Sequence, residues 1–399
     1  MQDRSDQAAD PQAAVIVCLD FGDDRGPAGR TTESYEEGVE EVVRLVESAG
    51  VTRHRVVGGR RARPDPKLYA GSGKVAEVGA AAEELNAACV VFNHELSPAQ
   101  GRNLEKALQR RVMARTDLIL EIFGQRARTS EGKLQVELAQ LERLSTRLVR
   151  GWSHLERQRG GLGATGGPGE KQLELDRRYI AHRVKVLKQR IHSLESQRRV
   201  QRRARARREV LSISIVGYTN AGKSTLFNAL THAGAYEADQ LFATLDTTSR
   251  RVWLGETGNV VLSDTVGFIR DLPHGLVAAF RATLEETVHA ELLLHVIDAS
   301  SPARDAQATE VDKVLAEIGA DSAPRLAVWN KIDLAGLSMG GIARAGAERD
   351  QYGRISRVFV SARTGAGLEE LRGAIAEFAR ERAAARSAAI PQAQPLQPH

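Results

Sequence analysis

Residues 217–225 read GYTNAGKST, and their glycines, lysine and serine have the spacing of a phosphate-binding loop. A strand-like apolar run, 210–216, precedes this segment, and a helix-like stretch, 226–230, follows it. Glycines let the backbone fold closely around a phosphate, and a helix N-terminus directs N–H donors and partial positive charge at it. We therefore expect the whole loop to contact a nucleotide: Gly217, Tyr218, Thr219, Asn220, Ala221, Gly222, Lys223, Ser224 and Thr225.

Two side chains of this loop have expected roles of their own. Lys223 would place a positive charge at the β- and γ-phosphates, and the Ser224 hydroxyl would ligate Mg²⁺.

Residues 240–248 (QLFATLDTT) are polar and rich in threonine, which suits a mobile switch loop. We expect Thr244 to close over the γ-phosphate and complete the Mg²⁺ shell. Thr247 and Thr248 are the alternatives, and the expected nucleotide contacts beside Thr244 are Phe242, Ala243 and Leu245.

A buried-strand pattern at 260–263 ends in Asp264, Thr265, Val266 and Gly267, a DxxG motif expected to contact the nucleotide. The Asp264 carboxylate would hold Mg²⁺, and the Gly267 N–H would reach the γ-phosphate because no side chain intervenes. The sequence thus predicts Lys223, Thr244 and Gly267 as catalytic residues. The predicted Mg²⁺ ligands are Ser224, Thr244 and Asp264.

Two later strand-like runs end in NKID (330–333) and SAR (361–363). The Asp333 carboxylate can accept hydrogen bonds from N1–H and the exocyclic amine of guanine, whereas adenine has no donor at either point. A buried acceptor without a partner costs about 1–3 kcal/mol, so GTP is favoured over ATP. A backbone N–H at 361–362 would read the guanine O6. The expected contacts with the base are Asn330, Lys331, Asp333, Ser361, Ala362 and Arg363.

Length and composition indicate a soluble protein of two or three domains, with 399 residues of which 42% are hydrophobic. Cys18 and Cys89 are the only cysteines, which excludes a disulfide framework and favours a reducing, cytoplasmic setting. Residues 1–13 have no apolar signal-peptide core, and no apolar run approaches the roughly 18–20 residues needed to span a bilayer. We expect neither secretion nor membrane insertion.

Strand-like and helix-like segments alternate over residues 14–120, which predicts a small α/β domain with a parallel sheet. The GSGK at 71–74 resembles a second phosphate loop. However, Leu68 stands where the first glycine should be, and Val75 stands where Ser or Thr should be. We interpret this stretch as an ordinary turn and helix start.

Residues 121–209 carry two apolar stripes close to a 3.5-residue repeat, which predicts two long helices packed as an antiparallel hairpin. The stripes are Leu134, Leu138, Leu141 and Leu148, then Ile180, Val184, Leu187, Ile191 and Leu194. A glycine-rich segment, 159–169, separates them.

Between Arg177 and Arg208 there are 13 Lys or Arg and one acid, Glu195. Such crowding of like charges predicts a polyanionic partner, and RNA suits the hairpin better than duplex DNA. A merely solvated linker helix is the alternative.

These patterns predict an α/β protein whose nucleotide-binding domain, 210–385, has a mostly parallel sheet. The hairpin (121–209) and the N-terminal α/β domain (14–120) precede it, and segments 1–13 and 386–399 are expected to be disordered.

The order and identity of the motifs resemble the translation-factor-related GTPases, and within them the HflX family. The resemblance extends over about residues 14–382. It is carried by LFATLDTT (241–248), DTVGFIRDLPHGLVAAFRATLEE (264–286), GKLQVELAQLERLSTRLVR (132–150) and GPGEKQLELDRR (167–178). It implies a monomeric, cytoplasmic GTPase that binds the large ribosomal subunit and ribosomal RNA through the basic hairpin. It also implies that the protein dissociates or rescues stalled ribosomes, with GTP hydrolysis stimulated by the ribosome.

Two features depart from that family pattern. The glycine-rich tip is one residue longer than usual, and Lys171 stands where threonine is common, so its RNA contacts are expected to differ. After a helix ending near Glu381 only a short tail remains, without the extra domain of some members.

Phe268 follows Gly267, where Ras-like GTPases place a glutamine that orients the attacking water. Phenylalanine cannot hydrogen-bond to water, so we expect slow intrinsic hydrolysis. One alternative function is an RNA-binding adaptor in which GTP only regulates docking. Another is an ATP-driven RNA remodeller, which the Asp333 argument disfavours.

Overall fold

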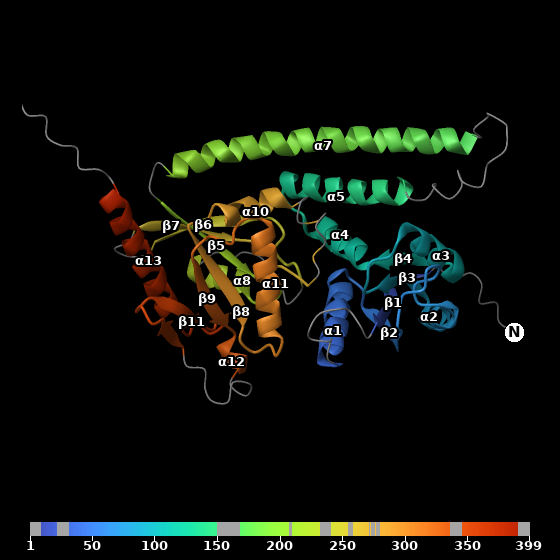
Figure 1. Cartoon of the computed structure of the whole chain (residues 1–399), viewed down its shortest axis with the longest axis horizontal. Coiled ribbons are helices and arrows are strands. Elements are labelled where there is room, and N and C mark those ends of the chain that lie inside the picture. Colours follow the sequence, from blue (N-terminus) through green and yellow to red (C-terminus); the bar gives the residue numbers. More distant parts are fainter. Residues whose placement is uncertain are drawn as a thin grey trace, which may run out of the picture. The chain divides into compact units, whose positions relative to one another are not determined.

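The computed structural model describes residues 9–21, 32–149, 168–206, 210–231, 241–253, 258–270, 272, 276, 280–335 and 345–389. They form two compact units, each with its own β-sheet (Figure 1). The first unit comprises Met1–Ser196, Gln240–Phe242 and Pro273–Ala279. The second comprises Gln197–Asp239, Ala243–Leu272 and Phe280–His399.

The first unit contains a four-stranded sheet of order β2-β1-β3-β4 in which every pair of neighbouring strands is parallel. Its strands are β1 (Asp10–Asp20), β2 (Arg53–Arg60), β3 (Ala87–Phe92) and β4 (Arg111–Ala114). Its helices are α1 (Thr32–Ser48), α2 (Ser72–Glu84), α3 (Pro98–Leu108) and α4 (Arg115–Arg126). The apolar run in β1 is buried from residue 13 to residue 19, as a central strand with both faces covered requires. The predicted parallel α/β architecture is confirmed.

Three boundaries differ from expectation. β1 begins at Asp10, inside the segment expected to be disordered, because Ala13 pairs with Arg53 of β2 and the Asp10 N–H donates to the Asn86 carbonyl. α4 continues through residue 120, where the sequence had suggested a domain boundary. α13 extends to Ala389, into the expected tail.

The glycine-rich segment at 71–74 begins a helix, as predicted. Gly71 precedes α2 with φ of 81°, and Lys74 points back to the sheet. The Lys74 ammonium donates to the Gly58 carbonyl at 2.8 Å and pairs with Glu77. The Lys74 ammonium is therefore engaged in contacts within the protein.

The hairpin consists of α5 (Ser130–Val149) and α7 (Pro168–Ala206), which lie side by side in Figure 1. Leu138, Leu187 and Ile191 are buried between them, with Leu134, Leu141 and Val184 partly buried around these three. Two ion pairs flank the apolar contact: Arg183 binds both carboxylate oxygens of Glu137, and Lys188 lies 2.8 Å from Glu142. Six of the nine residues in the predicted apolar stripes therefore form the helix contact; the side chain of Leu148 lies outside the described ones, and Ile180 and Leu194 are not part of this cluster. The glycine-rich tip lies outside the described residues.

The second unit contains a seven-stranded sheet of order β10-β11-β9-β8-β5-β7-β6. Its strands are β5 (Leu211–Gly217), β6 (Thr248–Trp253), β7 (Asn259–Asp264), β8 (Leu292–Asp298), β9 (Arg325–Asn330), β10 (Gly346–Arg349) and β11 (Ile355–Phe359). Its helices are α8 (Lys223–Thr231), α10 (Arg281–Val288), α11 (Arg304–Glu317), α12 (Ile332–Ala335) and α13 (Leu368–Ala389). The five central strands are parallel, and the edge strands β6 and β10 are antiparallel.

A core cluster of the second unit packs on one face of these parallel strands, together with α8 and α13. Ile213, Ile215, Leu294 and Val328 are fully buried in it. Burying one such side chain contributes about 1.5–3 kcal/mol, so the central strands are strongly fixed. As a result, the carboxyl ends of β5, β7, β8, β9 and β11 meet at one edge of the sheet. Among the described helices, none combines the length and the apolar character needed to cross a membrane.

Candidate nucleotide-binding site

The phosphate-binding loop connects β5 to α8, as the sequence predicted. Glycine is required at two of its positions. A Cβ on Gly217 would lie 2.3 Å from the Val296 carbonyl oxygen, and one on Gly222, where φ is 90°, would lie 2.2 Å from Asn330 Nδ2. Both glycines therefore allow the loop to pack directly against neighbouring strands at the sheet edge.

Lys223 opens α8 and is buried within the loop. Its ammonium donates to the Tyr218 carbonyl at 2.7 Å. Burial lowers the pKa of Lys223 to about 8, because a desolvated ammonium is disfavoured. An anion bound in the loop would counter this cost, which is the behaviour expected of a phosphate-binding lysine.

Ser224, Thr244 and Asp264 meet although they are far apart in the sequence. The Ser224 hydroxyl lies 2.7 Å from the Thr244 hydroxyl and donates to Asp264 Oδ2 at 2.8 Å. Asp264 is 1% exposed, and among the described residues its Oδ1 has no hydrogen-bond partner. Burial raises the pKa of Asp264. An unpaired carboxylate oxygen beside two hydroxyls suits a hard cation such as Mg²⁺.

The DxxG turn lies against the phosphate loop. The Phe268 N–H donates to the Gly217 carbonyl at 3.1 Å, and the Thr219 N–H donates to the Phe268 carbonyl at 2.7 Å. The Phe268 side chain is fully buried. A side chain at Gly267 would force the loop to shift, because a Cβ there would lie 2.9 Å from the backbone Cα of Thr219. Phe268 therefore anchors the turn in the core.

Asn330 connects three loops of the site. Its side-chain amide donates to the Ala221 carbonyl and accepts from the Ala362 N–H, both at 2.9 Å. Asp333 is exposed in the first turn of α12, so its carboxylate is accessible to a ligand. The NKxD and SA motifs are thereby joined to the phosphate loop, as their predicted roles require.

The other predicted contacts are distributed unevenly. Phe242 is buried, and its ring packs edge-on against Phe123 with centroids 4.7 Å apart, both residues belonging to the first unit. The Phe242 side chain therefore packs within the first unit, and its predicted contact with the nucleotide stays a prediction. Thr248 is the first residue of β6, whereas Thr244 bonds to Ser224. These positions favour Thr244 over Thr248 as the switch threonine.

Asp298 is a residue of the site that the sequence analysis missed. It ends β8, and its carboxylate lies 2.7 Å from the Lys331 ammonium. No motif marks it. The position rule that selected Asp264, a polar residue at the end of a buried parallel strand, would have found it.

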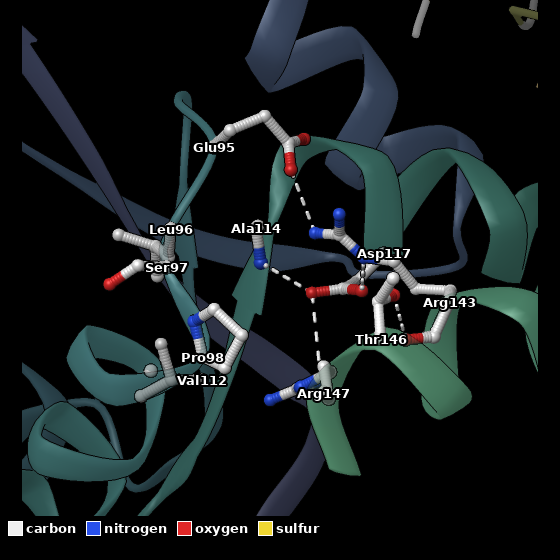
Figure 2. Close-up of a pocket in the computed structure, with 11 residues that line it drawn as sticks. Glu95, Leu96, Ser97, Pro98, Val112, Ala114, Asp117, Arg143, Thr146 and Arg147 are labelled. Atoms are coloured by element: carbon white, nitrogen blue, oxygen red, sulfur yellow. Dashed lines mark hydrogen bonds and ion pairs between the residues drawn. The ribbon is translucent and has the colours of Figure 1, made fainter. Parts of the chain in front are cut away.

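The first unit has a cavity of about 350 Å³ at the carboxyl end of β4 (Figure 2). Arg143 of α5 reaches across it, donating to Glu95 at 2.7 Å and to Asp117 at 3.0 Å. The Ala114 N–H also donates to Asp117, and Arg147 lies 3.8 Å from the same carboxylate. These polar groups bond to one another and fasten α5 to the sheet.

A phosphate loop, DxxG, NKxD and SA at the carboxyl edge of a mostly parallel sheet define a P-loop GTPase. Three family models match the chain: "GTP-binding GTPase N-terminal" over residues 36–124, "GTP-binding GTPase Middle Region" over 126–205 and "50S ribosome-binding GTPase" over 212–331. The chain is 50% identical to the GTPase HflX of Escherichia coli (strain K12) over 366 residues, covering 92% of this chain and 82% of that protein. The chain belongs to the HflX family, and it hydrolyses GTP.

Other comparisons agree with this assignment. The GTPase HflX of Magnetococcus marinus is 48% identical over 341 residues, covering 86% of this chain and 77% of that protein. The crystal structure of SsGBP in complex with GDP is 24% identical with a TM-score of 0.50, covering 92% of this chain and 98% of that one. This structural likeness shows the fold.

Proposed function

We propose that this GTPase binds the large ribosomal subunit through its helical hairpin, dissociates or rescues stalled ribosomes, and hydrolyses GTP faster when bound. The positive charge of residues 177–208, most of which belong to α7, is the observation that carries the proposal. From residue 177 to 208 the sequence has 13 basic residues and one acid. The match of residues 212–331 to a model described as a 50S ribosome-binding GTPase supports the choice of partner.

Several basic side chains in the described part of α7 are available to a polyanion. Arg177, Lys185 and Arg190 are exposed, while the opposite face of the helix packs on α5. Neutralising such charges with phosphates releases counterions, so affinity for the ribosome should fall steeply as salt increases. Replacing Arg190 by alanine should weaken binding at low salt and reduce the slope of this dependence by about one. A flat salt response would exclude phosphate contact as the main source of affinity.

α7 also exposes apolar surface near the start of its described side chains. Tyr179 is 70% exposed and Leu175, one turn earlier, is 56% exposed, whereas the adjacent Ile180 is buried. The Tyr179 ring is therefore accessible to stack on an unpaired RNA base. Tyr179→Ala should weaken ribosome binding about tenfold without changing the salt slope, and Tyr179→Phe should retain binding. Tyr352→Ala, at a comparably exposed tyrosine, is the control; equal losses in both variants would contradict a stacking role.

In the proposed site Lys223 binds the β- and γ-phosphates, and the Gly267 N–H and Thr244 close over the γ-phosphate. Ser224, Thr244 and Asp264 would hold Mg²⁺, which would neutralise phosphate charge. Asp333 would read the base. Asp333→Asn should shift preference from guanine to xanthine nucleotides, because xanthine has a carbonyl where guanine has its amine; competition assays would measure this. Unchanged guanine preference would contradict the assignment.

The buried Phe268 ring offers no hydrogen bond to an attacking water. We therefore expect a low intrinsic rate of GTP hydrolysis and strong stimulation by a partner that supplies or orders the missing group. GTP turnover should be measured with purified large subunits, small subunits and bare ribosomal RNA in parallel. Large subunits should give the greatest increase, and equal turnover in all reactions would contradict the proposal.

Splitting requires an experiment of its own. Light scattering of intact ribosomes should fall when the protein is added with GTP or with a non-hydrolysable analogue. Binding without any fall in scattering would instead favour a GTP-regulated RNA-binding adaptor.

A further inference from the structure

Asp298 and Lys331 form an ion pair at the edge of the sheet that carries the nucleotide site. Lys331 Nζ lies 2.7 Å from Asp298 Oδ2, and the two side chains are 24% and 15% exposed. The pair joins the ends of two neighbouring strands, because Asp298 of β8 is in register with Asn330 of β9. The Ala299 N–H also donates to the Asn330 carbonyl at 2.9 Å. The pair is therefore built on the rigid part of the sheet.

The Asp298 carboxylate is itself oriented. Its other oxygen, Oδ1, accepts hydrogen bonds from the Ser300 N–H at 3.0 Å and from the Ser300 hydroxyl at 2.6 Å. A carboxylate held in this way can fix the direction of a long, flexible lysine side chain. Fixing that side chain in advance removes part of the ordering cost of ligand binding.

The Lys331 side chain lies beside the phosphate loop, so its orientation bears on how a nucleotide would bind. Its Cε is 4.0 Å from the position that a Cβ on Gly222 would occupy, so its stem passes the phosphate loop. Its backbone has φ of 63°, and Asp333 follows two residues later. The Lys331 stem therefore passes the phosphate loop and belongs to the same turn as the residue proposed to read the base.

We infer that Asp298 is a positioning residue for guanine-nucleotide binding, holding Lys331 along the bound nucleoside through their ion pair. The inference rests on the proposed assignment of the base site to residues 330–333. The contact involves the nucleoside and not the γ-phosphate, so it should affect GTP and GDP alike. Loss of Asp298 should raise KM and the rate of GDP release while leaving kcat at saturating GTP unchanged.

Release of a fluorescent GDP analogue from the full chain tests this role. Asp298→Ala should release it about tenfold faster, the effect expected when one long side chain loses its preorganisation. Asp298→Asn, which keeps the volume and the acceptor for Ser300, should show most of that effect because the charge is lost. Glu310→Gln removes one charge from the exposed Glu310–Lys313 pair of α11 and should release the analogue at the normal rate.

A double-mutant cycle separates positioning through Lys331 from a general structural effect. If Asp298 acts through the lysine, the double variant of Asp298→Ala and Lys331→Ala should release the analogue no faster than Lys331→Ala alone. Multiplied effects of the two substitutions would overturn the inference. Unchanged release from Asp298→Ala, or an equal loss in kcat, would also overturn it. Asp333→Asn tests the underlying site separately, because its failure to change base preference would refute the site whatever Asp298 does.

Discussion

Acidic side chains at the carboxyl edges of the two sheets, the first parallel and the second mostly parallel, differ in how fully they are hydrogen-bonded. In the first unit, Glu95 accepts from Thr116 with one oxygen and from Arg143 with the other, and Asp117 accepts from the Ala114 N–H and from Arg143. In the second unit, Asp264 Oδ1 and Thr219 Oγ1 are buried without a hydrogen-bond partner among the described residues.

This difference shows how one architecture can serve two purposes. Each buried polar group without a partner costs about 1–3 kcal/mol, so an edge that keeps such groups is less stable until a ligand meets them. The first sheet uses its edge to attach a helix of the hairpin. The second keeps its edge for a nucleotide, and the two edges should respond in opposite ways to mutation.

Lys223→Met should produce the largest effect and separates activity from stability. GTP turnover should fall about 100–1000-fold, as when a donor to a transition-state oxyanion is removed. The nucleotide-free protein should unfold at the same temperature or higher, because the substitution removes a desolvated ammonium. Turnover assays and thermal unfolding without nucleotide measure the two effects. A variant destabilised without nucleotide would contradict the contrast between the edges.

His295 tests whether an unpaired buried group away from the edge behaves differently. It lies in the middle of β8, its Nε2 lacks a partner among the described residues, and burial lowers the pKa of His295 to about 4. The unfolded chain binds a proton near pH 6.5, so stability is fully present above this pH and is lost as pH falls toward 4. The loss should reach about 3 kcal/mol.

Urea unfolding of the wild type and of His295→Leu at pH 7, 5.5 and 4 would measure this contribution. The free energy of unfolding of the wild type should decrease more than that of His295→Leu as the pH falls from 7 to 4, because only the wild type must keep a buried imidazole neutral. Parallel pH profiles would show that His295 does not control acid stability. Saturating nucleotide should leave the pH dependence of the difference unchanged, since His295 is not at the edge.

Arg143→Ala should give the smallest effect of the three and the opposite pattern to Lys223→Met. It removes the hydrogen bonds that join α5 to Glu95 and Asp117, so unfolding should become easier by about 1–3 kcal/mol. GDP affinity should not change. Arg44→Ala, which breaks an exposed pair with Glu40 at 3.9 Å, is the matched control and should cost less than about 0.5 kcal/mol. Equal losses in the two variants would show that the edge of the first sheet is not held by Arg143.

The sequence predicted the central strands of the second unit well because they are mainly apolar runs, and β5, β7, β9 and β11 each lead into a motif. The phosphate loop after β5 and the DxxG turn after β7 are the clearest cases. The edge strands β6 and β10 escaped prediction because packing covers them less and their sequences lack such runs; β6 carries Arg250 and Arg251 in its middle. Whether such a segment becomes a strand depends on its pairing with a neighbouring strand, and the sequence alone does not identify that neighbour.

The candidate site likewise has residues that the sequence predicts and contacts that it does not. Motif spacing placed Lys223 and Asp264, because phosphate chemistry restricts the residue types at those positions. The spacing of residues along the sequence could not show that the Thr244 and Ser224 hydroxyls lie 2.7 Å apart, since the switch loop has no periodic apolar pattern. Asp298 is a lone acid outside every motif, and only the alignment of β8 with β9 brings it to Lys331.

The bridging amide of Asn330 also bears on how the protein is made. The three segments it joins lie at residues 221, 330 and 362, so the last is synthesised well after the first two. Domains generally fold as units during synthesis. A nascent chain that ends before residue 362 lacks the N–H that Asn330 accepts from, so this junction of three loops cannot form until that residue has been made.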